Sequence, residues 1–406
     1  MTRNDGPGDA RCRQCGVTIS PAWPIALVIL LMVLFGSGGE AAQLPSGAAQ
    51  PTVEGLQGLP ARMLRPLGTV EATYREQAIT EDTVWKGVVV LEGPVTVAPQ
   101  ATLTIRPGAV IVAKSSEAGG LGGTSLFVHG RLVVQGDAER PVLFTSAFAV
   151  PHPGDWYGVI LQGSEKKNQL DNCRIEGAER GLEAHFSSFT ASGVAFAHCR
   201  IALRLLDSLA SIRGMTVSDS PIGVMIQAGE TDLRDGVVSG GQSGIVAEAG
   251  SVTLRQVTVQ GAVTGLLAEG VRLQVRGALF TGNGSGLRLT ACEGEVVGVR
   301  VVDNRDEGLS LKRSRLKVHG NEISGNGRVG LRLGDTLAAL WGNIIRNNGA
   351  VELAYDGIGD LSLPGNWWGG LSLPELKKKV VPGQVADPPA RVLLAPLLAT
   401  PPSLPF

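Results

Sequence analysis

The stretch "SGIVAEAGSVTLRQVTVQGAVTGLLAEG" (243–270) contains one repeat unit of this chain and the start of the next. Apolar and polar residues alternate in "VTLR" and again in "VTVQ", and a short bend separates the two segments. Alternation at every second residue is typical of a β-strand with one buried face, whereas an amphipathic helix shows spacings of three and four. With "GIVA" as the third segment, the unit predicts three short strands joined by bends.

The same unit recurs at a fixed interval. A small residue followed by apolar-x-apolar begins at positions 181, 202, 223, 244, 265, 286, 308, 330 and 350, which gives steps of 20 to 22 residues. A fixed period of this length indicates a solenoid. Upstream, 83–112, 125–146 and 154–164 follow the same alternation less regularly and predict the opening rungs. We therefore expect an all-β fold, a single-stranded right-handed parallel β-helix with 21–22 residue coils and about 13 rungs.

Composition agrees with a coil of short strands and tight turns. The 406 residues include 56 glycines, are 43% apolar and only 4% aromatic, and carry a net charge of -1. A nearly neutral chain has no global attraction for nucleic acid or anionic membrane. Three cysteines, Cys173, Cys199 and Cys292, follow the N-terminal apolar segment, and this odd number argues against a disulfide framework.

The ends of the chain differ from the repeats. Arginines precede the apolar run "IALVILLMVLFG" (25–36), and small residues follow it, so residues 1–42 predict a signal peptide and a secreted, periplasmic or cell-envelope location. An uncleaved membrane anchor is the alternative. We expect a linker or N-terminal cap at 43–79, the β-helix at 80–370, and a cap at 371–406. That cap would comprise a short helix starting near Pro374 and a proline-rich tail along the wall.

The segments "VTVAPQATLTIRPGAVI", "RLVVQGDAERPVLFTS", "GDWYGVIL" and the terminal "GNWWG…VLLAPLL" resemble bacterial secreted proteins with parallel β-helix repeats, of the carbohydrate-binding and sugar-hydrolase (CASH), pectin-lyase-like type. The resemblance covers about residues 80–400. It implies the fold. It does not imply one function, because these proteins include lyases, hydrolases, epimerases, copper-site assembly proteins and surface proteins.

Residues one period apart stack in such a coil, so the sequence can be read as columns. One column consists of Arg213, Arg234, Arg255 and Arg276 at the outer edge of a bend. No carboxylate recurs beside this column, and only Asp232 and Asp235 flank one member. Forked guanidinium groups bind carboxylates well, so these arginines are our candidate ligand-binding residues for an acidic polysaccharide. A solvated face is the alternative.

A second column concerns the C-terminal end of the coil. Asn321, Asn343 and Asn366 stand at equivalent positions in "GNEI", "GNII" and "GNWW", and stacked asparagines at a bend can bond one another. Trp368 takes the inward place of Ile323 and Ile345, which predicts a lid on the core. Asn283, Asn304, Asn326 and Asn347 are assigned to another bend, where asparagine tolerates left-handed backbone angles.

The outward positions offer weaker candidates for catalysis. Glu248 and Glu269 fall on neighbouring rungs, and two carboxyl groups about 5 Å apart suit a retaining glycosidase. The outward column Glu183, Arg204, Met225, Val246, Leu267, Arg288, Ser310, Arg332 and Glu352 contains three consecutive apolar residues, which a loop, a partner or a sugar ring would cover. The five histidines share no ligand spacing, so we predict no metal and no cofactor.

The sequence thus favours a non-catalytic extracytoplasmic protein that binds a polysaccharide or another envelope component along one face. A polysaccharide lyase, hydrolase or epimerase and a structural surface rod without a ligand are the alternatives. We expect no nucleic-acid partner, and a membrane association only if the N-terminal segment is uncleaved. The oligomeric state and the ligand stay open.

Overall fold

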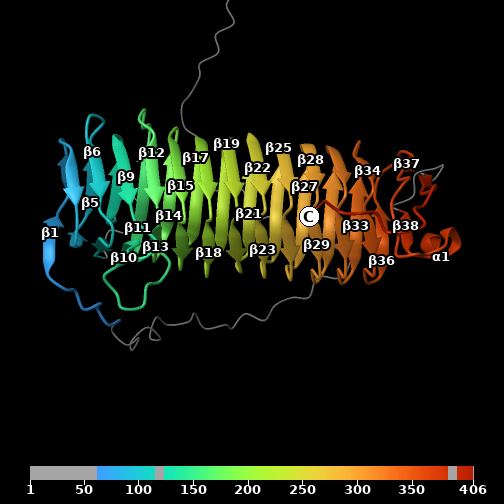
Figure 1. Ribbon diagram of the computed structural model, residues 1–406, viewed down its shortest axis with the longest axis horizontal. Helices are drawn as coiled ribbons and strands as arrows, with labels where there is room; N and C mark the ends of the chain where they lie inside the picture. The colour runs from blue at the N-terminus through green and yellow to red at the C-terminus, as the bar shows by residue number, and fades with distance from the viewer. Residues whose placement is uncertain (1–61, 115–122, 383–390, 406) are drawn as a thin grey trace, which may run out of the picture. The chain divides into compact units, whose positions relative to one another are not determined.

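The computed structural model describes residues 62–114, 123–382 and 391–405. These residues form a right-handed parallel β-helix of about 13 turns with one short helix near the C-terminus (Figure 1), which confirms the predicted fold class. The predicted signal peptide (1–42) lies outside the described residues. Strands β1 and β2 lie within 43–79, the segment for which the sequence predicted a linker or cap.

Each turn contributes one strand to each of three faces. Face 1 is a separate sheet of 13 strands, in the order β1 (Val70–Tyr74), β4 (Val88–Leu91), β7 (Val110–Ala113), β10 (Val142–Ser146), β13 (Cys173–Glu176), β16 (Ala195–Ala197), β18 (Thr216–Ser218), β20 (Val237–Ser239), β23 (Thr258–Gln260), β26 (Leu279–Thr281), β29 (Arg300–Val302), β32 (Glu322–Ser324) and β35 (Ile344–Arg346).

Face 2 carries most of the candidate site. Its strands are β2 (Gln77–Ile79), β5 (Pro94–Val97), β8 (Ser125–Val128), β11 (Trp156–Gln162), β14 (Ala178–His185), the first halves of β17 (Ile201–Arg213) and β19 (Ile222–Arg234), β21 (Ser243–Glu248), β24 (Thr264–Glu269), β27 (Ser285–Thr290), β30 (Glu307–Lys312), β33 (Val329–Gly334), β36 (Val351–Tyr355) and β38 (Val380–Pro382).

Face 3 follows face 2 in each turn. Its strands are β3 (Thr83–Trp85), β6 (Thr102–Ile105), β9 (Arg131–Gln135), β12 (Asn168–Asp171), β15 (Ser188–Ser192), the second halves of β17 and β19, β22 (Ser251–Arg255), β25 (Arg272–Arg276), β28 (Glu293–Val297), β31 (Arg315–His319) and β34 (Ala339–Trp341). Because β17 and β19 run through the bend without a break, faces 2 and 3 join into one sheet of 24 strands.

Alternation within the short strands sends every second side chain into a single continuous core. On face 2, for example, Leu203 pairs with Val224, Val224 with Ile245 and Ile245 with Leu266, and all four side chains are buried. All pairs of strands within these faces are parallel, and apart from register shifts in the pairs β1–β4 and β11–β14 they stay in register. Columns along the regular rungs are therefore physical stacks. Neighbouring rungs are about 4.8 Å apart.

A buried asparagine ladder follows face 1 in the C-terminal half. The side-chain amide of Asn283 donates to Asn304, that of Asn304 to Asn326, and that of Asn326 to Asn348, over 2.9–3.1 Å. The last member is therefore Asn348, and the assignment of Asn347 to this column was wrong. Asn347 is exposed and has a φ of 55°, whereas Asn348 is buried and faces inward.

This ladder explains why the repeat begins with glycine. A Cβ atom on Gly308 would stand 2.6 Å from Asn326 Nδ2, and one on Gly330 would stand 2.4 Å from Asn348 Nδ2. The sequence motifs at 330 and 350 suggest a final step of 20 residues, but the structural step from Leu331 to its partner Leu353 is 22 residues, as in the two rungs before it. Glu352 therefore takes the glycine position instead of an outward one, which corrects the sequence assignment, and its buried carboxylate accepts the Asn348 amide at 2.7 Å.

A second ladder and an aromatic residue lie at the last rungs. Asn321 donates to Asn343 and Asn343 to Asn366, both over 2.9 Å, and all three side chains are buried. Trp367 pairs with Ile344, so Trp368 takes the inward position, where it is 1% exposed. Its indole belongs to the same core cluster as Leu363, Leu376 and Leu394.

The C-terminal segment covers this end of the coil. Helix α1 (Leu373–Lys378) begins after Ser372, whose backbone N–H and hydroxyl both donate to Glu375, and it buries Leu376. β39 (Val392–Leu393) then pairs with β37 (Leu361–Ser362). The tail returns along the wall, where Pro405 lies against Gly298 and Gly320; a Cβ on Gly320 would be 3.0 Å from Pro405 Cδ.

Candidate functional site

The arginine column predicted from the period is in register along the end of face 3. Arg213 pairs with Arg234, Arg234 with Arg255 and Arg255 with Arg276. Three of them form ion pairs: Arg213 with Asp235 (3.0 Å), Arg234 with Asp232 (2.5 Å) and Arg276 with Glu295 (2.6 Å). The expectation that only Asp232 and Asp235 flank one member was wrong, since a carboxylate reaches three of the four.

Arg255 differs from the other three. Within the described residues it has no ion pair, and its buried Nε has no hydrogen-bond acceptor. It lies between Arg234 and Arg276, so one like charge stands one rung away on each side. The edge therefore keeps a cationic position at its centre even though most of its charge is balanced.

Glu248 and Glu269, the weak catalytic candidates, lie on neighbouring strands of face 2 and pair in register. Both side chains are exposed. Gln227 donates to Glu248 over 3.2 Å. No arginine, lysine or histidine forms an ion pair with either carboxylate among the described residues. One rung, about 4.8 Å, thus separates the two backbone positions, and both carboxyl groups stand in solvent rather than in an enclosed site.

The most organised polar cluster lies instead at the N-terminal side of face 2, around Glu183. This carboxylate is 1% exposed although its strand position points outward. It accepts hydrogen bonds from Arg180 (2.6 and 2.7 Å) and Arg204 (2.7 Å), and His185 Nε2 lies 2.6 Å from it. The Tyr157 hydroxyl completes the cluster, 3.2 Å from Glu183 and 2.7 Å from Arg180.

A β-bulge brings residues of two strands together in this cluster. The register between β11 and β14 shifts after the pair Gly158–Arg180, so that Val159 pairs with Leu182. Gly158 has a φ of 131°, and a Cβ there would overlap the Arg180 carbonyl at 1.6 Å, so only glycine fits. Bulges of this kind re-aim side chains near functional sites. Tyr157 and Arg180 flank the bulge.

The charges within the Glu183 cluster fix its protonation. Burial alone would raise the pKa of Glu183, but hydrogen bonds from Arg180 and His185 hold that pKa below its ordinary value. Burial and the nearby Glu183 charge raise the pKa of Tyr157 to about 12. Near neutral pH the cluster thus contains an ionised carboxylate, a protonated phenol and two guanidinium groups. One positive charge is left over.

An apolar strip extends from this cluster along face 2. Arg204 pairs with Met225, which is followed by Val246, Leu267 and Arg288 on successive rungs. Leu267 is 41% exposed, so described structure does not cover the strip fully. Ser243, Thr264 and Ser285 form a parallel column of hydroxyls, and Gln227, Glu248 and Glu269 line the other side.

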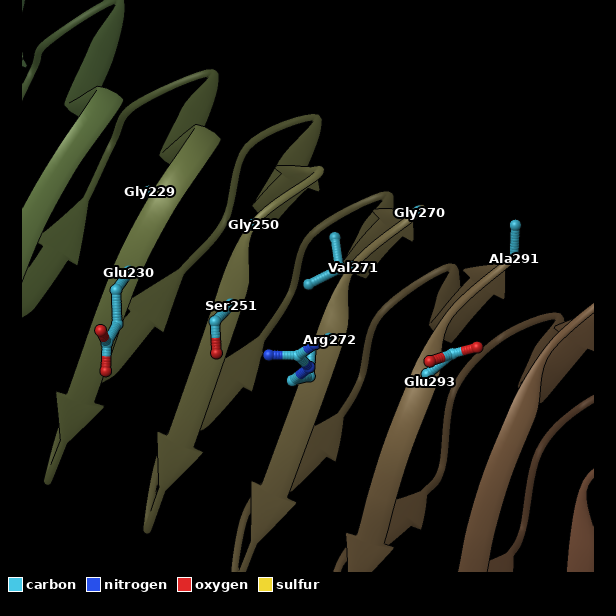
Figure 2. A pocket seen from close by; sticks show the side chains of 9 residues that line it. All are labelled: Gly229, Glu230, Gly250, Ser251, Gly270, Val271, Arg272, Ala291 and Glu293. Carbon is cyan, nitrogen blue, oxygen red and sulfur yellow. The ribbon is translucent and has the colours of Figure 1, made fainter.

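A shallow hollow lies at the bend between faces 2 and 3. Figure 2 shows that Gly229, Gly250 and Gly270 leave space there, while Glu230, Arg272 and Glu293 line one side. Gly229 and Gly250 stand in one column with Ser208 before them and Val271, Cys292 and Ser314 after them, whereas Gly270 precedes this column by one residue. The serine hydroxyls accept backbone N–H groups: Ser208 accepts from Ser187, and Ser314 from Cys292. The hollow therefore lies where a serine ladder is interrupted.

The donors for a metal are scattered. Cys173, Cys199 and Cys292 are free and buried, and burial raises the pKa of Cys173 and of Cys199 to about 12. His185 is bonded to Glu183 and His319 to Glu295. Among residues 62–114, 123–382 and 391–405, no three or more His, Cys, Asp and Glu side chains converge to hold an ion.

Two family models match the chain. Residues 77–184 match the pectate-lyase-like β-helix domain, and residues 208–359 match the periplasmic copper-binding protein (NosD) family. The second match agrees with the predicted periplasmic or cell-envelope location. The described residues do not fit copper, because the thiols are buried and protonated and the two bonded histidines lie on separate faces. No described helix is long and apolar enough to cross a membrane.

Solved structures give distant matches. The A-module of mannuronan C-5 epimerase AlgE4 of Azotobacter vinelandii is 15% identical, with 66% of this chain and 79% of that chain covered and a TM-score of 0.38. The periplasmic alginate epimerase AlgG is 13% identical, with 76% of each chain covered and a TM-score of 0.40. Tailspike protein 3 of bacteriophage CBA120 is 12% identical, with 81% and 56% covered and a TM-score of 0.39.

A comparison with curated protein sequences gives no match. The two matched segments lie one after the other in the same coil. The chain is a right-handed parallel β-helix protein that contains a pectate-lyase-like β-helix domain at residues 77–184 and is similar to the NosD family over residues 208–359.

Proposed function

We propose that the protein is an extracytoplasmic polysaccharide-binding β-helix, with an acidic glycan lying along face 2 and anchored at the Glu183 cluster. The observation that carries this proposal is the meeting of Arg180, Arg204 and His185 around one buried carboxylate. The surplus positive charge attracts an anion. In addition, Arg204 donates to both Glu183 and Gln227 (2.7 and 2.9 Å) and is 20% exposed, so its guanidinium group is held in place at the surface of face 2.

The strip beyond the cluster suits the rest of a glycan chain. Met225, Val246 and Leu267 form an apolar surface for the flat face of sugar rings, and the hydroxyls and carboxylates on either side can bond ring hydroxyls. Arg288 ends the strip and donates to Ser285, without a carboxylate partner among the described residues. A carboxylate near each end of the bound segment would fit this arrangement.

Binding to polygalacturonate, measured by calorimetry with fully methyl-esterified polymer as the neutral comparison, tests the proposal. Arg204→Gln should weaken binding roughly 10- to 100-fold, because it removes charged hydrogen bonds. Arg332→Gln is the matched control: it lies in the same outward column, it is similarly half-buried, and it also pairs with a buried glutamate, Glu307. Equal effects of the two variants, or equal binding of the neutral polymer, would overturn the proposal.

A second candidate function is acid–base chemistry on a uronic acid at the same cluster. His185 and Tyr157 favour it, because removing the proton next to a sugar carboxylate needs a base, a cation on the carboxylate and an acid. In an elimination, His185 would take that proton, the electron pair would form a C=C bond as the glycosidic C–O bond breaks, and Tyr157 would protonate the leaving oxygen. In an epimerisation, a proton would return to the same carbon from the opposite side.

An assay for unsaturated products and for inverted sugars separates the two candidates. An enzyme should lose turnover in His185→Gln but keep most of its affinity, whereas His152→Gln, at an exposed histidine outside the cluster, should leave turnover unchanged. Binding without any product in the unmodified protein would leave the non-catalytic proposal standing. Loss of activity in Glu248→Gln or Glu269→Gln instead would move the chemistry to that carboxyl pair.

A further inference from the structure

The arginine edge continues beyond Arg276 into an aromatic platform. In register, Arg276 is followed by Val297, His319 and Trp341 on the next three rungs. The edge from Arg213 to Trp341 therefore presents one side chain per rung over seven consecutive rungs. It lies at the end of face 3, away from the Glu183 cluster on face 2.

The platform is exposed and rigid. Trp341 is 42% exposed, and its ring stacks on His319 with centroids 4.5 Å apart and planes 15° apart. His319 Nε2 lies 3.1 Å from Glu295, which also accepts from Arg276 at 2.6 Å. The hydrogen bond from His319 lowers the pKa of Glu295, so this carboxylate stays ionised and fixes the imidazole orientation. The chain Arg276–Glu295–His319–Trp341 thus behaves as one preorganised unit.

Nothing in the core requires an aromatic residue at Trp341. Its side chain points outward at the end of β34, where the equivalent positions on other rungs carry Arg, Val or His. Arg255 lies four rungs from Trp341 toward the N-terminus, and it has no ion pair within the described residues. The edge therefore combines a stacking surface and an unbalanced cation about 19 Å apart, at about 4.8 Å per rung.

We infer that this edge is a second glycan-binding site, which takes an acidic oligosaccharide of about four residues or more. One sugar ring stacks on Trp341, and an acidic group toward the other end of the oligosaccharide binds Arg255 in its forked geometry. Flanking guanidinium groups of Arg234 and Arg276 raise the local positive potential. The ligand class follows from the proposed function, but the site uses none of the residues of the Glu183 cluster.

The test measures ligand binding through the indole N–H signal of Trp341. Protein with ¹⁵N-labelled tryptophan is titrated with a galacturonate hexamer, and the six indole N–H signals are recorded by NMR; the signal that disappears in Trp341→Phe identifies Trp341. We expect this signal to shift saturably. Trp341→Ala should weaken binding at this site roughly two- to tenfold, by loss of ring stacking. Arg255→Gln should weaken it roughly tenfold or more.

Two control variants accompany these. Leu337→Ala removes another exposed apolar side chain at the opposite bend of the same turn, and Arg305→Gln removes another exposed arginine; both should leave the titration unchanged. An unshifted Trp341 signal, or equal binding of the galacturonate hexamer by Trp341→Ala and unmodified protein, would overturn the inference. If Arg204→Gln abolishes all binding, the second site is wrong and the proposed function stands. If Trp341→Ala and Arg255→Gln abolish it while Arg204→Gln does not, the proposed function fails at face 2 and the edge is the binding site.

Discussion

The asparagine ladder and the arginine edge stack the same side chain on successive rungs, one inside the coil and one outside. Each amide from Asn283 to Asn348 both donates and accepts, so successive members satisfy one another and only the last, Asn348, donates to another residue type, Glu352. A guanidinium group only donates, so Arg213, Arg234 and Arg276 take carboxylates from other columns. A repeated asparagine therefore stabilises the inside of the coil, whereas a repeated arginine on the outside leaves positive charge that a ligand can bind.

Removing one member of the ladder should have the largest effect. Asn326→Ala leaves the Val301 carbonyl and the Asn304 backbone N–H buried without partners, since Asn326 bonds both. We expect a loss of about 3–5 kcal/mol in the free energy of unfolding, measured by urea denaturation. Asn347→Ala, one residue away but exposed, is the control. A loss below about 1 kcal/mol for Asn326→Ala would show that the ladder follows the fold without stabilising it.

Low pH should reduce the stability contributed by the buried Glu183 cluster more than the stability contributed by the exposed ion pairs. Because the pKa of Glu183 is lowered in the folded protein, its contribution to stability is complete above its ordinary pKa of 4.5 and is lost as the pH falls through the lower folded value. The melting temperature of the unmodified protein should therefore fall steeply below about pH 4.5. Glu183→Gln should flatten that fall, whereas Glu248→Gln, an exposed control on face 2, should not. The same slope in all three proteins would contradict the assigned charge state.

The smallest effect should come from an exposed pair of the arginine edge. Arg213 is 76% exposed and bonds Asp235 over 3.0 Å, and such surface pairs contribute little. Arg213→Ala should change the free energy of unfolding by at most about 1 kcal/mol, and the difference should shrink further in high salt. If Arg213→Ala lowered the free energy of unfolding as much as Asn326→Ala, the inner ladder and the outer edge would not differ in their contribution to stability.

The period of the sequence predicts most of this fold, because one repeat decides strand direction, face and register together. Its errors arise at the last rung, where the motif changes although the period does not. The final step is 22 residues, as in the two rungs before it, so Glu352 replaces a glycine and Asn348, one residue after Asn347, continues the ladder. Neither residue has an unusual type for its neighbourhood, so only the backbone step reveals their roles.

The Glu183 cluster was missed for a related reason. The outward column places Glu183 next to Arg204, which was a usable signal of an ion pair between rungs. Tyr157 and Arg180 join them through the bulge between β11 and β14, which shifts the register by one residue. No repeat motif marks that shift, so the meeting of the five side chains of the cluster could not be derived from spacing.

The return of the C-terminal tail has a consequence for the order of assembly. Pro405 contacts Gly298 and Gly320, so the last described residues of the chain bind rungs that are complete about a hundred positions earlier. A nascent chain that lacks residues 391–405 exposes the backbone edge of its newest rung, which is a template for pairing with another molecule. During synthesis the coil can therefore wind turn by turn, but residues 391–405 cover the wall only after the rungs that they contact have formed.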